Sequence, residues 1–152
     1  MQATVMGNPD ERVATLAPAR LSILCNNTTE SRRFYGNILG CQERRATPTS
    51  VGLDWFGSQL TIHQLDSYNA KTMLREVEGD DVPAPHFGAI IGENQFFQVA
   101  SRLKEAGWPF VISPYKQCRG EDLEHWILVV LDPSGNAIAL KSFTKVPAES
   151  WA

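Results

Sequence analysis

The sequence predicts an α+β fold made of two βαβββ modules, whose strands form a cupped mixed β-sheet with the helices on its outer face. Three observations carry this prediction. Most apolar residues fall in strand-length runs between turn residues, two segments show a helical period, and the order strand, helix, three strands occurs twice. With 152 residues, 43% of them hydrophobic, the chain is long enough for one domain with a sizeable core.

The first module is expected over residues 20–65. Arg20–Cys25 is an apolar run with the length of a strand. Asn27 follows as an N-cap, with Glu30 three residues later as its capping-box partner, and the helix that starts there is expected to end at Gly40. Three further strand-length segments complete the module: residues 41–46, 51–56 and 59–65.

The second module is expected over residues 86–143 and repeats this order. It opens with the apolar run His86–Ile91. Glu93–Ala106 then carries apolar residues on one helical face, and Gly107 is expected to end that helix. Three strands complete the module: residues 109–112, 125–131 and 136–143.

The remaining residues are expected outside the two modules. Residues 1–19 are interpreted as an N-terminal arm of the domain that spans residues 20–152. Residues 66–85 form a polar linker, in which Thr72–Glu78 has room for at most two helical turns, and residues 144–152 form a tail.

Composition and charge exclude several classes of protein. The net charge is −3 and no long run of Lys or Arg is present, so nucleic acid is not an expected partner. The longest apolar stretch, residues 126–131, is far shorter than the roughly 20 residues that span a bilayer, so no membrane contact is expected. Three widely spaced cysteines fit reduced thiols in the cytoplasm. We therefore expect a cytoplasmic protein.

Three segments, in this order and spacing, resemble the vicinal oxygen chelate superfamily. They are RFYGNILGC at residues 33–41, HFG at residues 86–88 and LDPSGNA at residues 131–137. This superfamily includes glyoxalase I, extradiol dioxygenases, fosfomycin-resistance proteins and bleomycin-resistance proteins. The resemblance covers residues 20–143 and implies a cup that holds a divalent metal, with ligands on the first strand of each module and on the last strand of the second.

The positions that the resemblance assigns to the metal ligands hold mostly unsuitable residues. They are Arg20, His86 and Ala139, with Thr61 at a possible fourth place. His86 matches the family, but Ala139 replaces a Glu, and a permanently charged guanidinium repels a cation. We therefore expect neither a metal nor another cofactor. Arg20 is interpreted as an electrophilic replacement that binds an oxyanion.

Strand alternation predicts further side chains that line the cup. Thr61 and His63 share one face of their strand, and Ala139 and Lys141 share one face of theirs. His125 points inward by the same rule. All three histidines of the chain are therefore candidates to meet in one pocket. His63 and His125 have the alternative of being strand-end histidines that are solvated or bonded to a backbone carbonyl.

Two aromatic residues complete the candidate set. Tyr115 begins a loop, residues 115–124, that is long enough to cover the mouth of the cup. Trp55 is interpreted either as a core residue or as a platform for a ligand. Arg20 has a structural alternative too, which is an ion pair with an acid such as Glu124.

The sequence leaves three functions open. The leading one is a metal-independent isomerase, lyase or cyclase, in which one of the three histidines moves a proton and Arg20 holds the developing oxyanion. The second is non-catalytic sequestration of a hydrophobic or aromatic compound, similar to that by bleomycin-resistance proteins. The third is a metal-dependent dioxygenase or glyoxalase with a rearranged ligand set of His63, His86 and His125. The resemblance also implies a small organic ligand or substrate and a homodimer.

Overall fold

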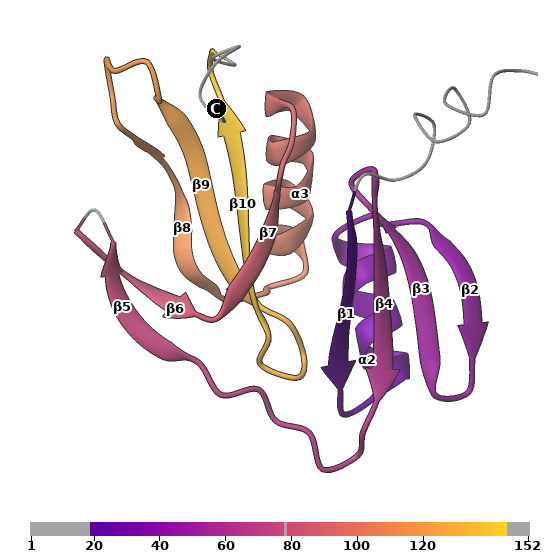
Figure 1. Ribbon diagram of the computed structural model, residues 1–152. Coiled ribbons are helices and arrows are strands. Elements are labelled where there is room, and N and C mark those ends of the chain that lie inside the picture. Colours follow the sequence, from indigo (N-terminus) through magenta and orange to yellow (C-terminus); the bar gives the residue numbers. More distant parts are fainter. Residues whose placement is uncertain (1–18, 78, 146–152) are drawn as a thin grey trace, which may run out of the picture.

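The computed structural model describes residues 19–77 and 79–145, and two four-stranded sheets with few helices make up its α+β fold (Figure 1). The predicted N-terminal arm, residues 1–19, and tail, residues 144–152, lie almost entirely outside the described residues. The two sheets belong to the two modules, and a third, two-stranded sheet lies between them in the sequence.

The first sheet has the strand order β1-β4-β3-β2, in which β1 runs parallel to β4 and the other neighbours are antiparallel. Its strands are β1 (Arg20–Cys25), β2 (Glu43–Thr47), β3 (Ser50–Trp55) and β4 (Ser58–Gln64). Alternate residues of β1, β3 and β4 are buried against the helical side, as in a sheet with one solvated face.

The helical segment of this module begins where the capping pattern predicts. The Asn27 side chain accepts a hydrogen bond from the Glu30 N–H at 3.1 Å, which starts α2 (Thr28–Arg32). The chain continues in a wider π-helical turn, η1 (Arg33–Ile38), and reverses at Gly40 with φ of 80°.

The second sheet repeats the first with the order β7-β10-β9-β8, and β7 is parallel to β10. Its elements are β7 (His86–Ile90), α3 (Glu93–Glu105), β8 (Phe110–Gln117), β9 (His125–Leu131) and β10 (Ala137–Phe143). The register is repeated too: Arg20 pairs with Gln59 in the first sheet, and His86 pairs with Ala137 in the second. The predicted internal duplication is thus present in the strand pairing.

One expectation about local structure was wrong. The prediction of a strand only over residues 109–112, followed by a loop from Tyr115, fails because β8 runs on to Gln117. In the sequence, Pro114 looks like the end of a strand because proline has no backbone N–H to donate. β8 is an edge strand with register shifts, where a proline is tolerated. Tyr115 therefore lies on a strand.

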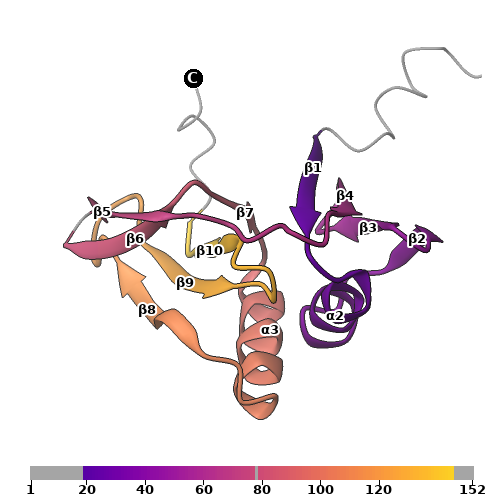
Figure 2. The same cartoon turned by 90° about the horizontal axis from the view of Figure 1, so that it is seen from below.

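The linker between the modules contains a hairpin that the sequence did not predict. β5 (Met73–Val77) and β6 (Asp80–Ala84) are antiparallel, and the turn between them includes Gly79, whose φ is 87°. Figure 2 shows this hairpin on the side of the second sheet opposite α3.

One hydrophobic core joins the two modules. It includes Tyr35 and Leu60 from the first module and Phe96 and Leu140 from the second, all fully buried. Both sheets turn the face that packs on their helices toward this core, and α2 and α3 lie on the same side of the two sheets (Figure 2). The opposite faces of the sheets are therefore the ones available to a ligand.

Polar contacts fix the angle between the modules. The buried carboxylate of Asp132 accepts a hydrogen bond from the Tyr35 hydroxyl at 2.8 Å, and Asn136 donates to the carbonyl of Leu24 at 2.9 Å. On the helical side, the Arg102 guanidinium donates to the carbonyl of Ile38 at 2.8 Å. These bonds join residues 64 to 112 positions apart in the sequence, so the arrangement depends on long-range packing.

Candidate functional site

The face of the first sheet that points away from α2 and η1, here called the open face, carries polar side chains in three rows across the strands. The register defines the rows, and strand alternation places their members on one face. The rows are Arg20–Gln59–Asp54, Ser22–Thr61–Gly52–Arg45 and Leu24–His63–Ser50–Thr47.

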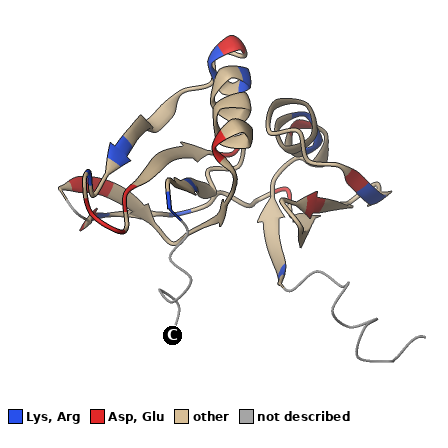
Figure 3. Cartoon of the chain, turned by 90° about the horizontal axis from the view of Figure 1, so that it is seen from above, with Lys and Arg blue, Asp and Glu red and all other residues tan. Residues whose placement is uncertain are grey.

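A cavity of about 320 Å³ lies on this open face, and we call it the first-module cavity. Arg20, Thr61 and His63 line it together with Arg45 and Gly52. Gly52 sits in the middle row, where the absence of a side chain leaves room. Figure 3 shows basic residues at the start of β1 and on β2, at the two edges of this sheet. The cavity therefore combines a guanidinium, a hydroxyl and an imidazole, which are groups that bind anions and move protons.

A second cavity, of about 440 Å³, lies between the modules, and we call it the His86 cavity. Four of the candidate residues line it: Trp55, His86, Ala139 and Lys141. Trp55 is only 4% exposed and its indole N–H donates to the carbonyl of Gly88 at 3.2 Å, so its ring forms a fixed aromatic wall. The His86 Nδ1 atom lies 2.9 Å from the carbonyl oxygen of Pro83 on β6.

Gly88 is required for the wall of the His86 cavity. A Cβ atom at this position would lie 1.7 Å from the carbonyl oxygen of Ala139, which is a backbone atom of the neighbouring strand. Only glycine permits β7 to approach β10 this closely. The close approach keeps the strand that carries His86 beside the strand that carries Ala139 and Lys141.

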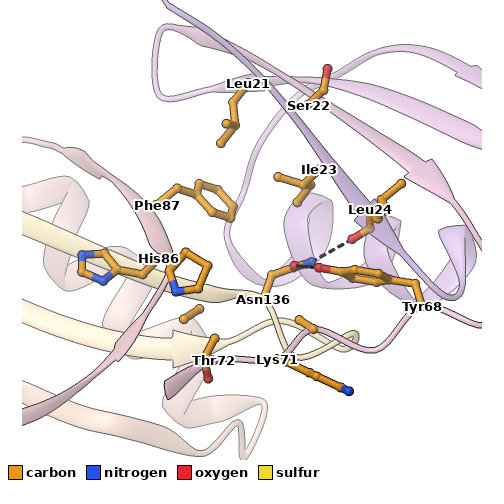
Figure 4. A pocket seen from close by; sticks show the side chains of 13 residues that line it. Leu21, Ser22, Ile23, Leu24, Tyr68, Lys71, Thr72, His86, Phe87 and Asn136 are labelled. Atoms are coloured by element: carbon orange, nitrogen blue, oxygen red, sulfur yellow. Dashed lines mark hydrogen bonds between the residues drawn. The ribbon is translucent and has the colours of Figure 1, made fainter. Parts of the chain in front are cut away.

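A third cavity, of about 390 Å³, opens between β1, the linker and β7 and is mostly apolar (Figure 4). Leu24 and Phe87 are among the residues that line it, and Asn136 closes one end by donating to the Leu24 carbonyl and accepting from the Tyr68 hydroxyl at 2.6 Å. The ring of His86 points away from β1 in this view. The imidazole of His86 therefore faces the hairpin rather than the open face of the first sheet.

The last two candidate residues lie beneath the β5–β6 hairpin. His125 is 4% exposed, and both its ring nitrogens have partners: the Leu123 carbonyl at 2.7 Å and the Gln117 side-chain oxygen at 2.9 Å. The Tyr115 hydroxyl donates to the carboxylate of Asp80, which ties the hairpin to β8. These contacts match the structural alternative for a strand-end histidine.

The structure does not bring the three histidines into one pocket. His63 lies in the first-module cavity, His86 in the His86 cavity, and His125 under the hairpin. Within residues 19–77 and 79–145, no three His, Cys, Asp or Glu side chains gather as metal ligands would. The rearranged ligand set of His63, His86 and His125 is therefore not assembled in this chain.

The positions at which the family places its metal are divided in the same way. Arg20 and Thr61 line the first-module cavity, whereas His86 and Ala139 line the His86 cavity. A divalent ion needs about three imidazole or carboxylate ligands, and these four positions offer one. The residues present do not fit a metal at the inherited place.

Comparison with known proteins agrees with the duplicated fold. Residues 17–140 match the Glyoxalase/Bleomycin resistance protein/Dioxygenase superfamily, which is a vicinal oxygen chelate family, and the chain belongs to it. A comparison with curated protein sequences gave no match.

Solved structures with this fold include a glyoxalase/bleomycin resistance protein/dioxygenase from Alicyclobacillus acidocaldarius. It is 26% identical, with a TM-score of 0.67 over 84% of this chain and 91% of that one. The fosfomycin resistance protein FosX from Listeria monocytogenes is 15% identical, with a TM-score of 0.59 over 83% of this chain and 92% of that one. A lactoylglutathione lyase from Agrobacterium tumefaciens is 12% identical, with a TM-score of 0.55 over 83% of this chain and 92% of that one.

Among the described residues, no helix has the length and apolar character needed to cross a membrane.

Sequence reasoning missed two features of the first-module cavity. Arg45 reaches it because a β-bulge between Glu43 and Arg45 changes the alternation of β2, and no sequence signal marks that bulge. The room above Gly52 was missed as well, although a glycine inside a strand is a recognised sign of close approach or of a site.

Proposed function

We propose that this protein is a metal-independent enzyme of small-molecule metabolism, of the isomerase, lyase or cyclase type, with its active site in the first-module cavity. His63 acts as the general acid or base, Arg20 holds the developing oxyanion, and Thr61 lies between them on β4 and adds a hydroxyl. One observation supports this proposal most strongly: Arg20 and His63 line the same cavity.

The register explains how these groups share one substrate. Arg20 lies beside Gln59, and His63 is four residues further along β4 on the same face. Two strand steps of about 6.8 Å each separate their backbones, and the long arginine side chain shortens the gap between the functional groups. A small carbonyl compound fits between them, with its oxygen at the guanidinium and the adjacent C–H toward the imidazole.

The chemistry follows from these two groups. An imidazole near neutral pH removes a proton from the carbon next to a carbonyl, and the resulting enolate carries its charge on oxygen. The guanidinium donors stabilise that oxygen more strongly than the neutral carbonyl, so they lower the barrier. The same imidazole returns the proton to another atom in an isomerisation, or to a leaving group in an elimination.

Exchange of substrate C–H protons with solvent deuterium tests this proposal without knowledge of the natural substrate. A panel of 2-oxo acids is incubated with the protein in D₂O and followed by NMR. We expect at least one compound to exchange, His63→Gln to lower the rate about a hundredfold, and Arg20→Gln to lower it about tenfold or more. His86→Gln is the matched control. An exchange rate that His63→Gln leaves unchanged contradicts the proposal.

A second candidate function is sequestration of an aromatic compound in the His86 cavity. The aromatic wall formed by Trp55, with Lys141 and His86 as polar groups at the same cavity, favours a flat ligand with a carboxylate. Binding of 2-naphthoate, measured by calorimetry, distinguishes this candidate. Binding that Lys141→Gln weakens and His63→Gln leaves unchanged supports sequestration, whereas no binding contradicts it.

A further inference from the structure

Two consecutive arginines of β2 reach the open face of the first sheet. The register pairs Glu43 with Leu53 but Arg45 with Gly52, so a β-bulge inserts Arg44 between these pairs. A bulge of this kind changes the direction of side chains on the strand that carries it. As a result both Arg44 and Arg45 line the first-module cavity.

Only one of these two positive charges is neutralised within the described structure. Arg44 Nη2 lies 3.1 Å from the carboxylate of Asp54. Neither Arg45 nor Arg20 forms an ion pair with any residue in the described ranges, and none of the described residues that line the cavity is acidic. Two guanidinium groups are therefore available to a ligand in a cavity of about 320 Å³.

Arg20 and Arg45 approach the cavity from opposite edges of the sheet. Arg20 lies on β1 and Arg45 on β2, with β4 and β3 between them. Three strand spacings of about 4.8 Å and a shift of one row, about 6.8 Å, place their backbones roughly 16 Å apart. Two arginines at opposite edges match two separate anionic groups better than one compact anion, because each planar fork of donors binds one carboxylate or phosphate.

The centre of the cavity suits the uncharged middle of such a ligand. Gly52 has no side chain there, and even a Cβ atom would have its nearest neighbour, the Arg45 carbonyl oxygen, at 3.7 Å. Thr61 pairs with Gly52 in the same row. A ligand that spans the two arginines therefore crosses β4 close to Thr61, and His63 lies in the next row.

We propose that the first-module cavity binds a small molecule with two separated anionic groups, such as a dicarboxylate, with one group on Arg20 and the other on Arg45. This ligand class rests on the proposed function, because the anion at Arg20 is next to the group that becomes the oxyanion. Arg45 is a specificity-determining residue that selects substrates by their second charge.

Calorimetry at low ionic strength with unbranched dicarboxylates, from succinate to suberate, tests this proposal. Butyrate and inorganic phosphate serve as the probes with one anionic group. We expect one chain length to bind best and to bind at least tenfold more tightly than butyrate or phosphate, as an extra charge-assisted contact provides. Arg45→Gln should remove this preference, so that the dicarboxylate binds no better than butyrate. Arg33→Gln, which removes a positive charge from η1, should leave the affinity within about twofold.

The outcomes separate this proposal from the proposed function. If Arg45→Gln binds the dicarboxylate as tightly as wild type, the two-anion ligand is refuted, while proton transfer by His63 with Arg20 still stands. If Arg33→Gln weakens binding as much as Arg45→Gln, the preference reflects the overall charge of the protein and the proposal is refuted. Thermal unfolding of each variant shows whether a lost affinity comes from lost structure.

Discussion

Asp132 is a buried carboxylate outside the cavities that links the two modules. It is 4% exposed, it accepts hydrogen bonds from the Tyr35 hydroxyl, from the Asn136 side chain at 2.7 Å and from two backbone N–H groups, and no described cation neutralises it. Burial raises the pKa of Asp132 above its ordinary value, and these donors oppose that rise. Burial and the neighbouring Asp132 raise the pKa of Tyr35 well above its ordinary value.

Tyr35→Phe should therefore destabilise the fold by about 1.5–3 kcal/mol at neutral pH, because a buried carboxylate loses a hydrogen bond. Tyr68→Phe is the matched control. It removes a bond to the neutral Asn136 side chain and should cost about 1 kcal/mol. Urea unfolding of both variants measures the difference in free energy.

The loss of stability caused by Tyr35→Phe should become smaller as the pH falls. The Tyr35 hydroxyl stabilises the ionised form of Asp132 and so lowers the pKa of that carboxyl in the folded state. The stability contributed by the bond between Tyr35 and Asp132 is therefore present above the pKa of Asp132 in the folded state and is lost as the pH falls through that pKa. A cost of Tyr35→Phe that grows toward acid pH contradicts this account.

Gly88→Ala tests a second single residue. A Cβ atom 1.7 Å from the backbone oxygen of Ala139 forces β7 away from β10, so we expect a loss of about 3 kcal/mol or more. Gly36→Ala is the control, since its Cβ would meet its nearest atom at 3.9 Å inside a helical segment. That variant should be stabilised by up to about 1 kcal/mol. Equal effects in thermal unfolding contradict the close-approach argument.

At the scale of elements, the sequence predicts structure well where the signal is local. β1 begins at Arg20 and ends at Cys25 as predicted, and Asn27 caps the helix that follows. His125, Ile127 and Val129 share the face of β9 opposite to the one that packs in the main core. These features depend on period and capping within a few residues.

The sequence does not predict features that depend on contacts between distant segments. The polar sequence of residues 73–84 gives no sign of the β5–β6 hairpin. The hairpin is held in part by contacts with a distant strand, since Gln117 and Tyr115 on β8 both donate to Asp80. The distribution of the candidate residues over separate cavities depends on how the modules pack, through bonds such as Tyr35 to Asp132. No local pattern contains that information.

The segment between β8 and β9 is anchored by Glu124. The Gly120 N–H, the Lys116 ammonium and the Thr144 hydroxyl all bond to its carboxylate and lower the pKa of Glu124 to about 2. Because the pKa of Glu124 is lowered, its bonds to the segment are fully present at pH values above its ordinary pKa of 4.5 and are lost as the pH falls through about 2. At pH 5, Glu124→Ala should therefore speed amide hydrogen exchange at Gly120, whereas Glu121→Ala in the same segment should not. Unchanged exchange in Glu124→Ala contradicts the anchor.

For the whole molecule, we expect a homodimer. Two large apolar side chains of β5 are strongly exposed, Met73 at 81% and Leu74 at 66%, and strand alternation places them on opposite faces of the β5–β6 hairpin. We expect a second copy of the chain to cover at least one of these faces. Light scattering should give twice the chain mass of 16.9 kDa, and the double variant Met73→Asp with Leu74→Asp should lower it. A wild-type monomer at every concentration contradicts this expectation.

The central claim is that the first-module cavity, rather than the His86 cavity, receives the substrate. The chain has three histidines, and each lies in a different environment, so their imidazole NMR signals report three places at once. Single His→Gln variants assign the signals. Titration with 2-oxoglutarate, which has two carboxylates and a carbonyl, should shift the signal of His63 and leave those of His86 and His125 in place. A shift of the His86 signal with the His63 signal unchanged would contradict the claim.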